Sequence, residues 1–395
     1  MGTTRNVKHH FKVNPIRIGI VCYPTFGGSG VVATELGKAL AKKGHEIHFI
    51  TYSQPSRLDF LNENLFYHEV DFRTYPLFEY PPYETALASK MVSVVKNERL
   101  DLLHVHYAIP HASAAYLARQ ILRTDNTIIP VVTTLHGTDI TLVGKDASYA
   151  PVVTFSINES DGVTAVSEDL KRETLQYFKI TQDIEVIPNF VDMEKFRKMK
   201  KDHFKKAICP HGEALIVHIS NFRKVKRIND VLQVFARVRR EIPAKLLMIG
   251  DGPERVSAEI VRRELAISDD VRFLGKLEAV EEVLSVADLF IMTSEKESFG
   301  LAALEAMACE VPVVSTNAGG LPELNIQGET GFLSAVGDIE DMTQKSLLIL
   351  DKENLPRFKA NALARAREFD ISKVMPLYEQ FYARVIDRTT VKTLS

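Results

Sequence analysis

Apolar segments of strand length alternate with amphipathic segments of helix length along almost the whole chain of 395 residues. The run IRIGIVCYP at 16–24 precedes the helical pattern VVATELGKALAKK at 31–43, and the short apolar run HEIHFIT follows at 45–51. This order predicts a βαβ unit. Its continuation as far as GVTAVS at 162–167 predicts a mostly parallel sheet with helices on both faces.

The same rhythm restarts after a polar, lysine-rich bridge at about 195–212. We expect strands at ALIVHIS, AKLLMIG, VRFLG, DLFIMT and VPVVST, between 214 and 316. The restart predicts an α/β protein of two Rossmann-like domains, at 1–190 and 191–375, with a C-terminal helix and tail at 376–395. One of the last helices is a candidate to cross back to the first domain. Ligands of such sheets bind at the carboxyl ends of the strands, so a cleft between two facing domains is the expected site.

Composition narrows the possible partners. The net charge of −2 gives no overall electrostatic reason to expect nucleic acid or an anionic membrane. Cys22, Cys209 and Cys309 have no disulfide or zinc spacing, which fits a reducing compartment. No run of about eighteen apolar residues could span a bilayer. We therefore expect a cytoplasmic protein without nucleic-acid partners or stable membrane insertion, and a homo-oligomer remains open.

The first predicted strand is followed by the glycine-rich loop GGSG at 27–30, which lets backbone approach a ligand at a helix N-terminus. This loop is not GxGxxG. The second strand ends in Thr51 and Tyr52, where an NAD-binding protein would have an acidic residue. A dinucleotide-dependent oxidoreductase is therefore disfavoured.

The loop NFRKVKR at 221–227 places four cations directly before a predicted helix: Arg223, Lys224, Lys226 and Arg227. Cations at a helix N-terminus oppose the helix dipole, and a bound anion would resolve this conflict. A solvated charged turn is the alternative, because screened surface charges cost little.

Two glutamates, Glu297 and Glu305, flank a predicted helix start in ESFGLAALEAMA. Eight helical residues rise roughly 12 Å, so the two carboxylates cannot share one ligand atom. They could hold opposite ends of one long ligand, with the amides of 299–301 facing an anion between them. Hydroxyl, diphosphate and hydroxyl groups in that order describe a nucleotide sugar. The alternative is an acid at a helix N-terminus and an unrelated exposed glutamate.

Histidines also occur at predicted strand ends. His136 and Asp139 follow one strand in TLHGTD, and His104 and His106 lie on one face of another. The latter spacing resembles a metal-binding pair, but no carboxylate-rich ligand set accompanies it. The chain also has no Asp-x-Asp sequence. We therefore expect no metal, and charge neutralisation by Arg, Lys and helix N-termini.

Together these segments resemble a known family. ESFGLAALEAMA is similar to the E-x7-E motif of retaining glycosyltransferases of family 4, which have the GT-B fold. GGSG, LHGTD, VTAVSEDL, VIPNFVD, IGDGPE, FLG and NAGGLPE follow in the order of that family. The resemblance implies an enzyme whose first domain binds the acceptor and whose second domain binds a UDP-sugar.

Within the family, FEYPPYETALASKM, LLHVHYAIPHA and HISNFRKVKRINDV resemble the branch that joins N-acetylglucosamine to L-malate in bacillithiol biosynthesis. This implies UDP-N-acetylglucosamine and L-malate as substrates. A diacid acceptor also fits a loop with more cations than one diphosphate needs. Other acceptors, such as an inositol phosphate or a lipid carrier, remain open, as does a binding protein that closes on a nucleotide sugar without chemistry.

The resemblance also implies roles for individual residues. Glu305 would hold the ribose and Glu297 the sugar hydroxyls, while Arg223 and Lys226 would neutralise the diphosphate and His136 would contact the donor sugar. The other expected donor-binding residues are Gly28, Ser29, Lys276, Phe299, Gly300 and Leu301. The expected acceptor-binding residues are Ser29, Tyr107, Thr134, Asn221 and Arg223.

Three positions depart from the usual family pattern. Asn221 stands where many relatives have arginine, so the diphosphate-binding cation is expected to shift to Arg223. Phe190 follows Asn189 where glycine is usual, and this variant suits the malate-using branch. Glu310 stands where a glycine usually ends the helix, and it would be slightly strained in a left-handed conformation.

Overall fold

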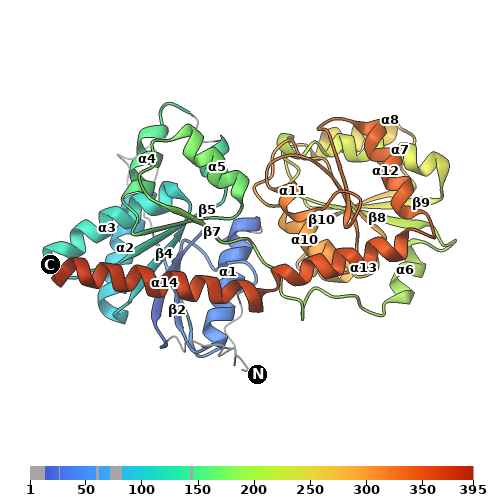
Figure 1. Cartoon of the computed structure of the whole chain (residues 1–395). Helices are drawn as coiled ribbons and strands as arrows, with labels where there is room; N and C mark the ends of the chain where they lie inside the picture. The colour runs from blue at the N-terminus through green and yellow to red at the C-terminus, as the bar shows by residue number, and fades with distance from the viewer. Residues whose placement is uncertain (1–13, 26, 59–61, 72–81, 143–145, 395) are drawn as a thin grey trace, which may run out of the picture.

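The computed structural model describes residues 14–25, 27–58, 62–71, 82–142 and 146–394. Two α/β domains lie side by side, each built on a parallel sheet, and the first sheet has seven strands and the second six (Figure 1). The predicted pair of Rossmann-like domains is confirmed. Among the described residues, no helix is both long and apolar enough to cross a membrane.

The first sheet has the strand order β3-β2-β1-β4-β5-β6-β7. Central strands such as β1 are buried on both faces, which explains their continuous apolar sequences. The strands are β1 (Arg17–Val21), β2 (Glu46–Thr51), β3 (Leu65–Glu69), β4 (Leu102–His106), β5 (Val131–Leu135), β6 (Gly162–Ala165) and β7 (Ile184–Val186).

Helices cover both faces of this sheet, as expected for right-handed parallel crossovers. They are α1 (Gly28–Lys42), α2 (Tyr83–Glu98), α3 (Ser113–Thr124), α4 (Ala150–Asn158) and α5 (Glu168–Tyr177). Two short π-type turns, η1 (Ala108–Ala112) and η2 (Thr138–Leu142), follow the ends of β4 and β5. They shape the strand-end loops where the sequence predicts a site.

The second sheet has the order β10-β9-β8-β11-β12-β13. Its strands are β8 (Ala214–Ile219), β9 (Ala244–Ile249), β10 (Val271–Gly275), β11 (Leu289–Met292), β12 (Val313–Thr316) and β13 (Gly331–Ser334). Its helical elements are α6 (Asp202–Ile208), η3 (Lys224–Lys226), α7 (Ile228–Glu241), α8 (Arg255–Glu264), α9 (Val280–Leu284), α10 (Leu301–Ala308), α11 (Leu321–Leu324), α12 (Ile339–Leu350), α13 (Leu355–Ala366) and η4 (Arg367–Phe369).

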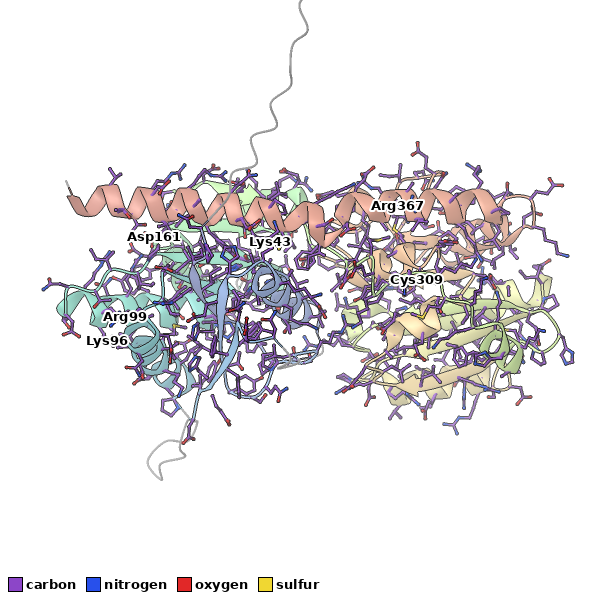
Figure 2. All side chains as sticks on the ribbon, turned by 90° about the horizontal axis from the view of Figure 1, so that it is seen from below. Lys43, Lys96, Arg99, Asp161, Cys309 and Arg367 are labelled. Atoms are coloured by element: carbon purple, nitrogen blue, oxygen red, sulfur yellow. The ribbon has the colours of Figure 1, made fainter. Side chains whose placement is uncertain are left out.

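The final helix, α14 (Ile371–Leu394), leaves the second domain and packs on the first (Figure 1). Its Tyr378 and Tyr382 are fully buried in a cluster that also contains Ile18 and Ile20 of β1. Figure 2 shows Lys43 beside this helix, where its ammonium lies 3.0 Å from Glu379. The chain therefore crosses back to its first domain, through a helix that begins at Ile371.

Three positions at helix ends of the second domain have informative conformations. Pro253 lies in the turn directly before α8, which begins at Arg255. Cys309 lies directly after α10, where it is buried. Glu310 has a φ of 62°, so the strained left-handed conformation expected for this position is present.

Candidate active site

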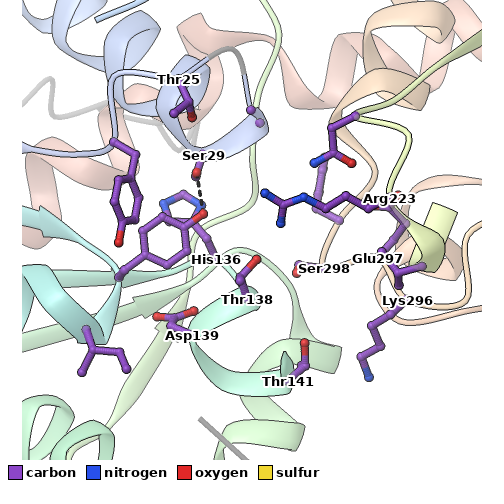
Figure 3. A pocket seen from close by; sticks show the side chains of 18 of the residues that line it. Thr25, Ser29, His136, Thr138, Asp139, Thr141, Arg223, Lys296, Glu297 and Ser298 are labelled. Carbon is purple, nitrogen blue, oxygen red and sulfur yellow. Dashed lines mark hydrogen bonds between the residues drawn. The ribbon is translucent and has the colours of Figure 1, made fainter. Parts of the chain in front are cut away.

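A cavity of about 940 Å³ lies between the two domains and is lined by residues of both. It lies where strands of both sheets end, at the place expected for a ligand of parallel sheets. The predicted residues that line it are Gly28, Ser29, Tyr107, His136, Asn221, Arg223, Lys226, Glu297, Phe299, Gly300 and Leu301. Figure 3 shows Arg223 extending toward Ser29 on the opposite side of the cavity.

The first turn of α1 forms one wall on the first domain. The Tyr107 hydroxyl, at the end of β4, donates a hydrogen bond of 2.6 Å to Oγ of Ser29 (Figure 3). Burial raises the pKa of Tyr107, so this phenol stays protonated at neutral pH. A Cβ on Gly30 would lie 2.5 Å from the carbonyl oxygen of Tyr23, which explains a glycine at this point of the loop.

His136, directly after β5, forms part of the cavity floor and is only 9% exposed. Its Nε2 lies 2.7 Å from Nδ1 of His106 on β4. Burial lowers the pKa of His136 to about 3, so its imidazole is neutral at physiological pH. A neutral ring can orient or polarise a ligand, but it contributes no charge to anion binding.

Asp139 joins two strand-end loops at the same edge of the sheet. Its carboxylate accepts hydrogen bonds from the backbone of Ala108, at 2.8 Å, and of Gly137, at 3.1 Å. Burial raises the pKa of Asp139 to about 6, although these hydrogen bonds oppose the shift. Asp139 lines the cavity, and its two backbone hydrogen bonds hold the two loops that form this part of the cavity wall.

The cationic loop of the second domain divides into two functions. Arg227 pairs with Asp230 and Glu295, so its charge is satisfied within the domain. Lys224 is exposed and outside the cavity lining. Arg223 and Lys226 do line the cavity. Only two of the four cations are therefore placed to meet an anion. Lys224 fits the solvated-turn alternative, and Arg227 is held in ion pairs.

Lys226 is not free in this structure, because Oε1 of Glu297 lies 2.5 Å from its ammonium. The same oxygen accepts a hydrogen bond of 2.8 Å from Ser294. Glu297 thus positions Lys226 through Oε1, and both of these hydrogen bonds leave its second oxygen unused. Lys226 and Glu297 thus place one cation and one carboxylate side by side, just before the N-terminus of α10.

The N-terminus of α10 faces the cavity through Phe299, Gly300 and Leu301. Gly300 has a φ of 95°, and a Cβ there would lie 2.6 Å from Leu321. The glycine therefore allows the chain to turn into the helix, and the first amides of α10 remain available for an anion.

Three predicted site residues lie outside the cavity lining. Thr134 is fully buried behind it, since its hydroxyl bonds His104 and Thr164, each at 2.7 Å. Thr134 was expected to contact the acceptor directly, and in this arrangement its side chain does not reach the cavity. Lys276 is exposed beyond the end of β10. Glu305 is buried in a small adjoining pocket, where it meets Arg57 of the first domain.

The histidine pair on β4 has protein partners. His104 bonds Thr134 through Nε2 and Tyr382 of α14 through Nδ1, at 2.7 and 2.8 Å. His106 bonds His136. In the described ranges, no group of three or more His, Cys, Asp or Glu side chains could hold a metal ion.

Several cavity residues were not identified from the sequence. They include Tyr23 after β1, Glu84 in the first turn of α2, and Lys296 and Ser298 between β11 and α10. Tyr23 and Ser298 occupy strand-end positions, which was an available signal. Glu84 gave none, because an acid in a first helical turn is already explained by the helix dipole.

Comparisons with known proteins agree with this architecture. The family described as Glycosyltransferase Family 4 matches residues 26–195, and that described as Glycosyl transferases group 1 matches residues 199–365. The chain is 48% identical over 377 residues to N-acetyl-alpha-D-glucosaminyl L-malate synthase of Bacillus anthracis, covering 94% of this chain and 97% of that protein.

Solved structures show the same fold at low sequence identity. Sucrose-phosphate synthase from Thermosynechococcus elongatus has a TM-score of 0.79 at 20% identity, and the match covers 94% of this chain and 100% of the synthase chain. Anabaena HepE, in complex with UDP and glucose, has a TM-score of 0.78 at 19% identity, and the match covers 93% of this chain and 99% of the HepE chain. The facing sheets and the cavity between them have the GT-B fold, and the 48% identical relative and the two matching family models make the chain a glycosyltransferase. The sequence matches place the chain more narrowly: it belongs to the family 4 glycosyltransferases.

Proposed function

We propose that this protein is a retaining hexosyltransferase that moves N-acetylglucosamine from UDP-N-acetylglucosamine to the hydroxyl group of L-malate, the first step of bacillithiol biosynthesis. The observation that carries the proposal is the 48% identity to N-acetyl-alpha-D-glucosaminyl L-malate synthase of Bacillus anthracis, over nearly the full length of both chains. The cavity supports it with two cations, a helix N-terminus and hydroxyl donors from both domains.

The donor is expected to lie along the second domain. Arg223, Lys226 and the first amides of α10 would stabilise the diphosphate as negative charge develops on the departing UDP. Glu297 would bind sugar hydroxyls through the oxygen that does not hold Lys226. In the same proposal Glu305 binds the ribose hydroxyls and the backbone at Lys276 meets uracil.

The acceptor is expected to lie against the first domain. Ser29 and Tyr107 form a hydrogen-bonded pair on that wall, and Asn221 and Arg223 face it from the second domain. One guanidinium between the two substrates can pair with a phosphate and a malate carboxylate. Thr134 would act from behind this wall, through its contact with His104.

We propose retention without a protein nucleophile. The malate hydroxyl attacks the anomeric carbon on the face that UDP leaves, the carbon–oxygen bond to UDP breaks, and the hydroxyl proton passes to a phosphate oxygen of UDP. Positioning and charge stabilisation then supply most of the rate enhancement, without a metal ion. We further propose that the enzyme works in the cytoplasm. In this proposal residues 1–190 bind the acceptor, residues 191–375 bind the donor, and residues 376–395 are a C-terminal helix and tail.

The test is UDP release by the purified protein with UDP-N-acetylglucosamine, with and without L-malate. Succinate, which has both carboxylates but no hydroxyl, is the matched control and should not support release. Release only with another hydroxyl compound would contradict the malate assignment. Tight UDP binding without transfer to any acceptor would instead favour a nucleotide-sugar-binding protein. Turnover that disappears with a chelator and returns with a divalent ion would contradict the metal-independent mechanism.

A further inference from the structure

The rings of His136 and His106 are hydrogen-bonded to each other at the floor of the cavity. Nε2 of His136 lies 2.7 Å from Nδ1 of His106, and the two ring planes are inclined by 24° with their centroids 5.0 Å apart. A hydrogen bond needs one donor and one acceptor, so only one of these two nitrogens carries a proton. The two possible arrangements present different groups to a ligand.

Both rings are neutral. His104, His106, His111 and His136 are all buried at 9% exposure or less, so a proton added to one of them would be both desolvated and close to other imidazoles. Burial lowers the pKa of His136 to about 3 and that of His106 well below its usual value. Each ring therefore carries one proton, and the question is which nitrogen holds it.

The other nitrogen of His106 decides between the arrangements. Nε2 of His106 is buried and has no hydrogen-bond partner among the described residues. If His136 donated to His106, the proton of His106 would sit on this Nε2 as an unpaired buried donor. In the reverse arrangement, only an unpaired lone pair is buried there. Unpaired buried N–H groups are the rarer and more costly of the two.

We infer that His106 donates from Nδ1 to Nε2 of His136 and so holds His136 in the tautomer that carries its proton on Nδ1. His136 lines the cavity, and the described part of the chain provides no hydrogen-bond partner for its Nδ1. The residue therefore presents an N–H donor to a ligand oxygen. With Nε2 occupied and Nδ1 protonated, His136 has no lone pair available to remove a proton from an acceptor hydroxyl. His106 is a positioning residue that acts through His136.

The tautomer itself needs no substrate, but its use toward an oxygen of the donor sugar rests on the proposed function. The first test is therefore made without ligand. The full-length protein is labelled with ¹⁵N in its histidines, and long-range ¹H–¹⁵N spectra at neutral pH distinguish protonated from unprotonated ring nitrogens. Signals of His106 and His136 are assigned by the variants H106N and H136N. We expect both residues to be protonated on Nδ1, and a His136 protonated on Nε2 would overturn the inference.

Matched variants of His106 then test the consequence for transfer. In H106N the amide N–H occupies the place of the Nδ1 donor, whereas H106L has similar bulk and no donor. We expect kcat to fall roughly tenfold further in H106L than in H106N, with a smaller change in KM for UDP-N-acetylglucosamine. The His136 signals of H106L should also shift toward the Nε2-protonated form.

Equal kcat values in the two variants, with the Nδ1 proton of His136 retained in H106L, would reduce His106 to a packing residue and overturn its positioning role. Failure of the proposed function is recognised separately, because the wild-type protein would then lack malate-dependent UDP release while the spectra still report the tautomer. If H106L does not fold, as judged by its melting transition, the wild-type spectra still decide the question.

Discussion

The guanidinium of Arg57 lies 3.2 Å from Oε1 of Glu305, across the boundary between the two domains. The side chains are only 13% and 8% exposed. Burial raises the pKa of Glu305, and Arg57 opposes this shift by favouring the carboxylate. The guanidinium also lies 5.7 Å from the ring centre of Phe196. The carboxylate proposed for the ribose thus already has a cationic partner, supplied by the opposite domain.

This pair gives opposite expectations for its two members. E305A should raise the dissociation constant of UDP roughly tenfold, because it removes a charged hydrogen-bond acceptor from the ribose site. R57A should lower that constant roughly fivefold, because the nucleotide no longer has to displace the guanidinium from its buried ion pair with Glu305. Titration calorimetry with UDP measures both constants. Weaker binding by R57A would mean that Arg57 stays at the nucleotide, and unchanged binding by E305A would remove Glu305 from the site.

Arg223 should contribute to both substrates. We expect R223A to raise KM for malate and to lower kcat, with a combined loss of roughly 10 to 100-fold in kcat/KM, because one guanidinium is proposed to serve diphosphate and acceptor. Lys224 is the matched control, since it is the adjacent cation, exposed and outside the cavity lining. Steady-state rates with varied malate check the difference. Equal losses in R223A and K224A would indicate a general effect of loop charge.

Gly137 allows the two domains to approach closely, because it has no side chain. A Cβ at this position would lie 1.8 Å from Oγ of Ser298 in the second domain, and the residue has a φ of 106°. We expect G137A to lower kcat roughly tenfold or more, because the reacting groups are held apart. G212A is the control, with a φ of 79° and open space around its Cβ. The double variant G137A/S298G should recover activity, and its failure to do so would assign the effect to backbone strain.

Stability should fall as the pH drops below about 6.5. Burial lowers the pKa of His104 and His136 to about 3 and that of His111 to about 4. These histidines bind protons in the unfolded chain before they do so in the folded protein. Each therefore contributes stability above its unfolded pKa that is lost toward the folded pKa, with a slope of up to about 1.4 kcal/mol per pH unit.

Asp139 acts in the opposite sense, because its pKa is raised to about 6 and its contribution is lost as the pH rises through that value. The histidines outnumber it, so the net slope should be destabilising in acid. Urea unfolding at about pH 7.5 and about pH 5.5 measures the slope. The dependence of the free energy of unfolding on pH should decrease in H104Q and stay unchanged in H203Q, because His203 is exposed. Equal slopes in both variants would contradict the assignment to the buried cluster.

Replacing Glu310 with glycine should stabilise the folded protein. Its φ of 62° strains an L-residue, and relief of about 1 kcal/mol is partly offset by the greater freedom of glycine in the unfolded chain. We expect E310G to raise the free energy of unfolding by about 0.5 kcal/mol, measured by urea denaturation. E310A keeps the Cβ and removes the carboxylate that lies 3.6 Å from Lys198, so it separates charge from backbone. A gain in E310A equal to that in E310G would assign the effect to charge.

The sequence predicts the central strands of both sheets well, because buried parallel strands are continuous apolar runs. It does not mark the edge strand β3, where only the first residue of LFYHE is buried, nor the four-residue β13. The cavity residues were predictable to the extent that strand ends share one edge of a sheet. This argument brings together Ser29, Tyr107 and His136, which follow three different strands of the first sheet.

What the sequence could not predict depends on contacts between distant segments. Arg57 and Glu305 are separated by 248 positions and meet only because the domains face each other. Thr134 lies next to the last residue of β5, but its side chain bonds His104 and Thr164 within the sheet and does not line the cavity. The direction of a side chain at a strand end follows from its neighbours across the sheet, and no local pattern specifies it.

The position of α14 ties the folding of the first domain to the synthesis of the second. Tyr378 and Tyr382 fill the first-domain cluster around Ile18 and Ile20, yet the ribosome adds them after every strand of the second sheet. The first domain can form its sheet early but cannot close this face until the chain has reached Val385. The order of synthesis therefore makes the two domains complete their folding together, which connects the fold of the first domain to the presence of the second.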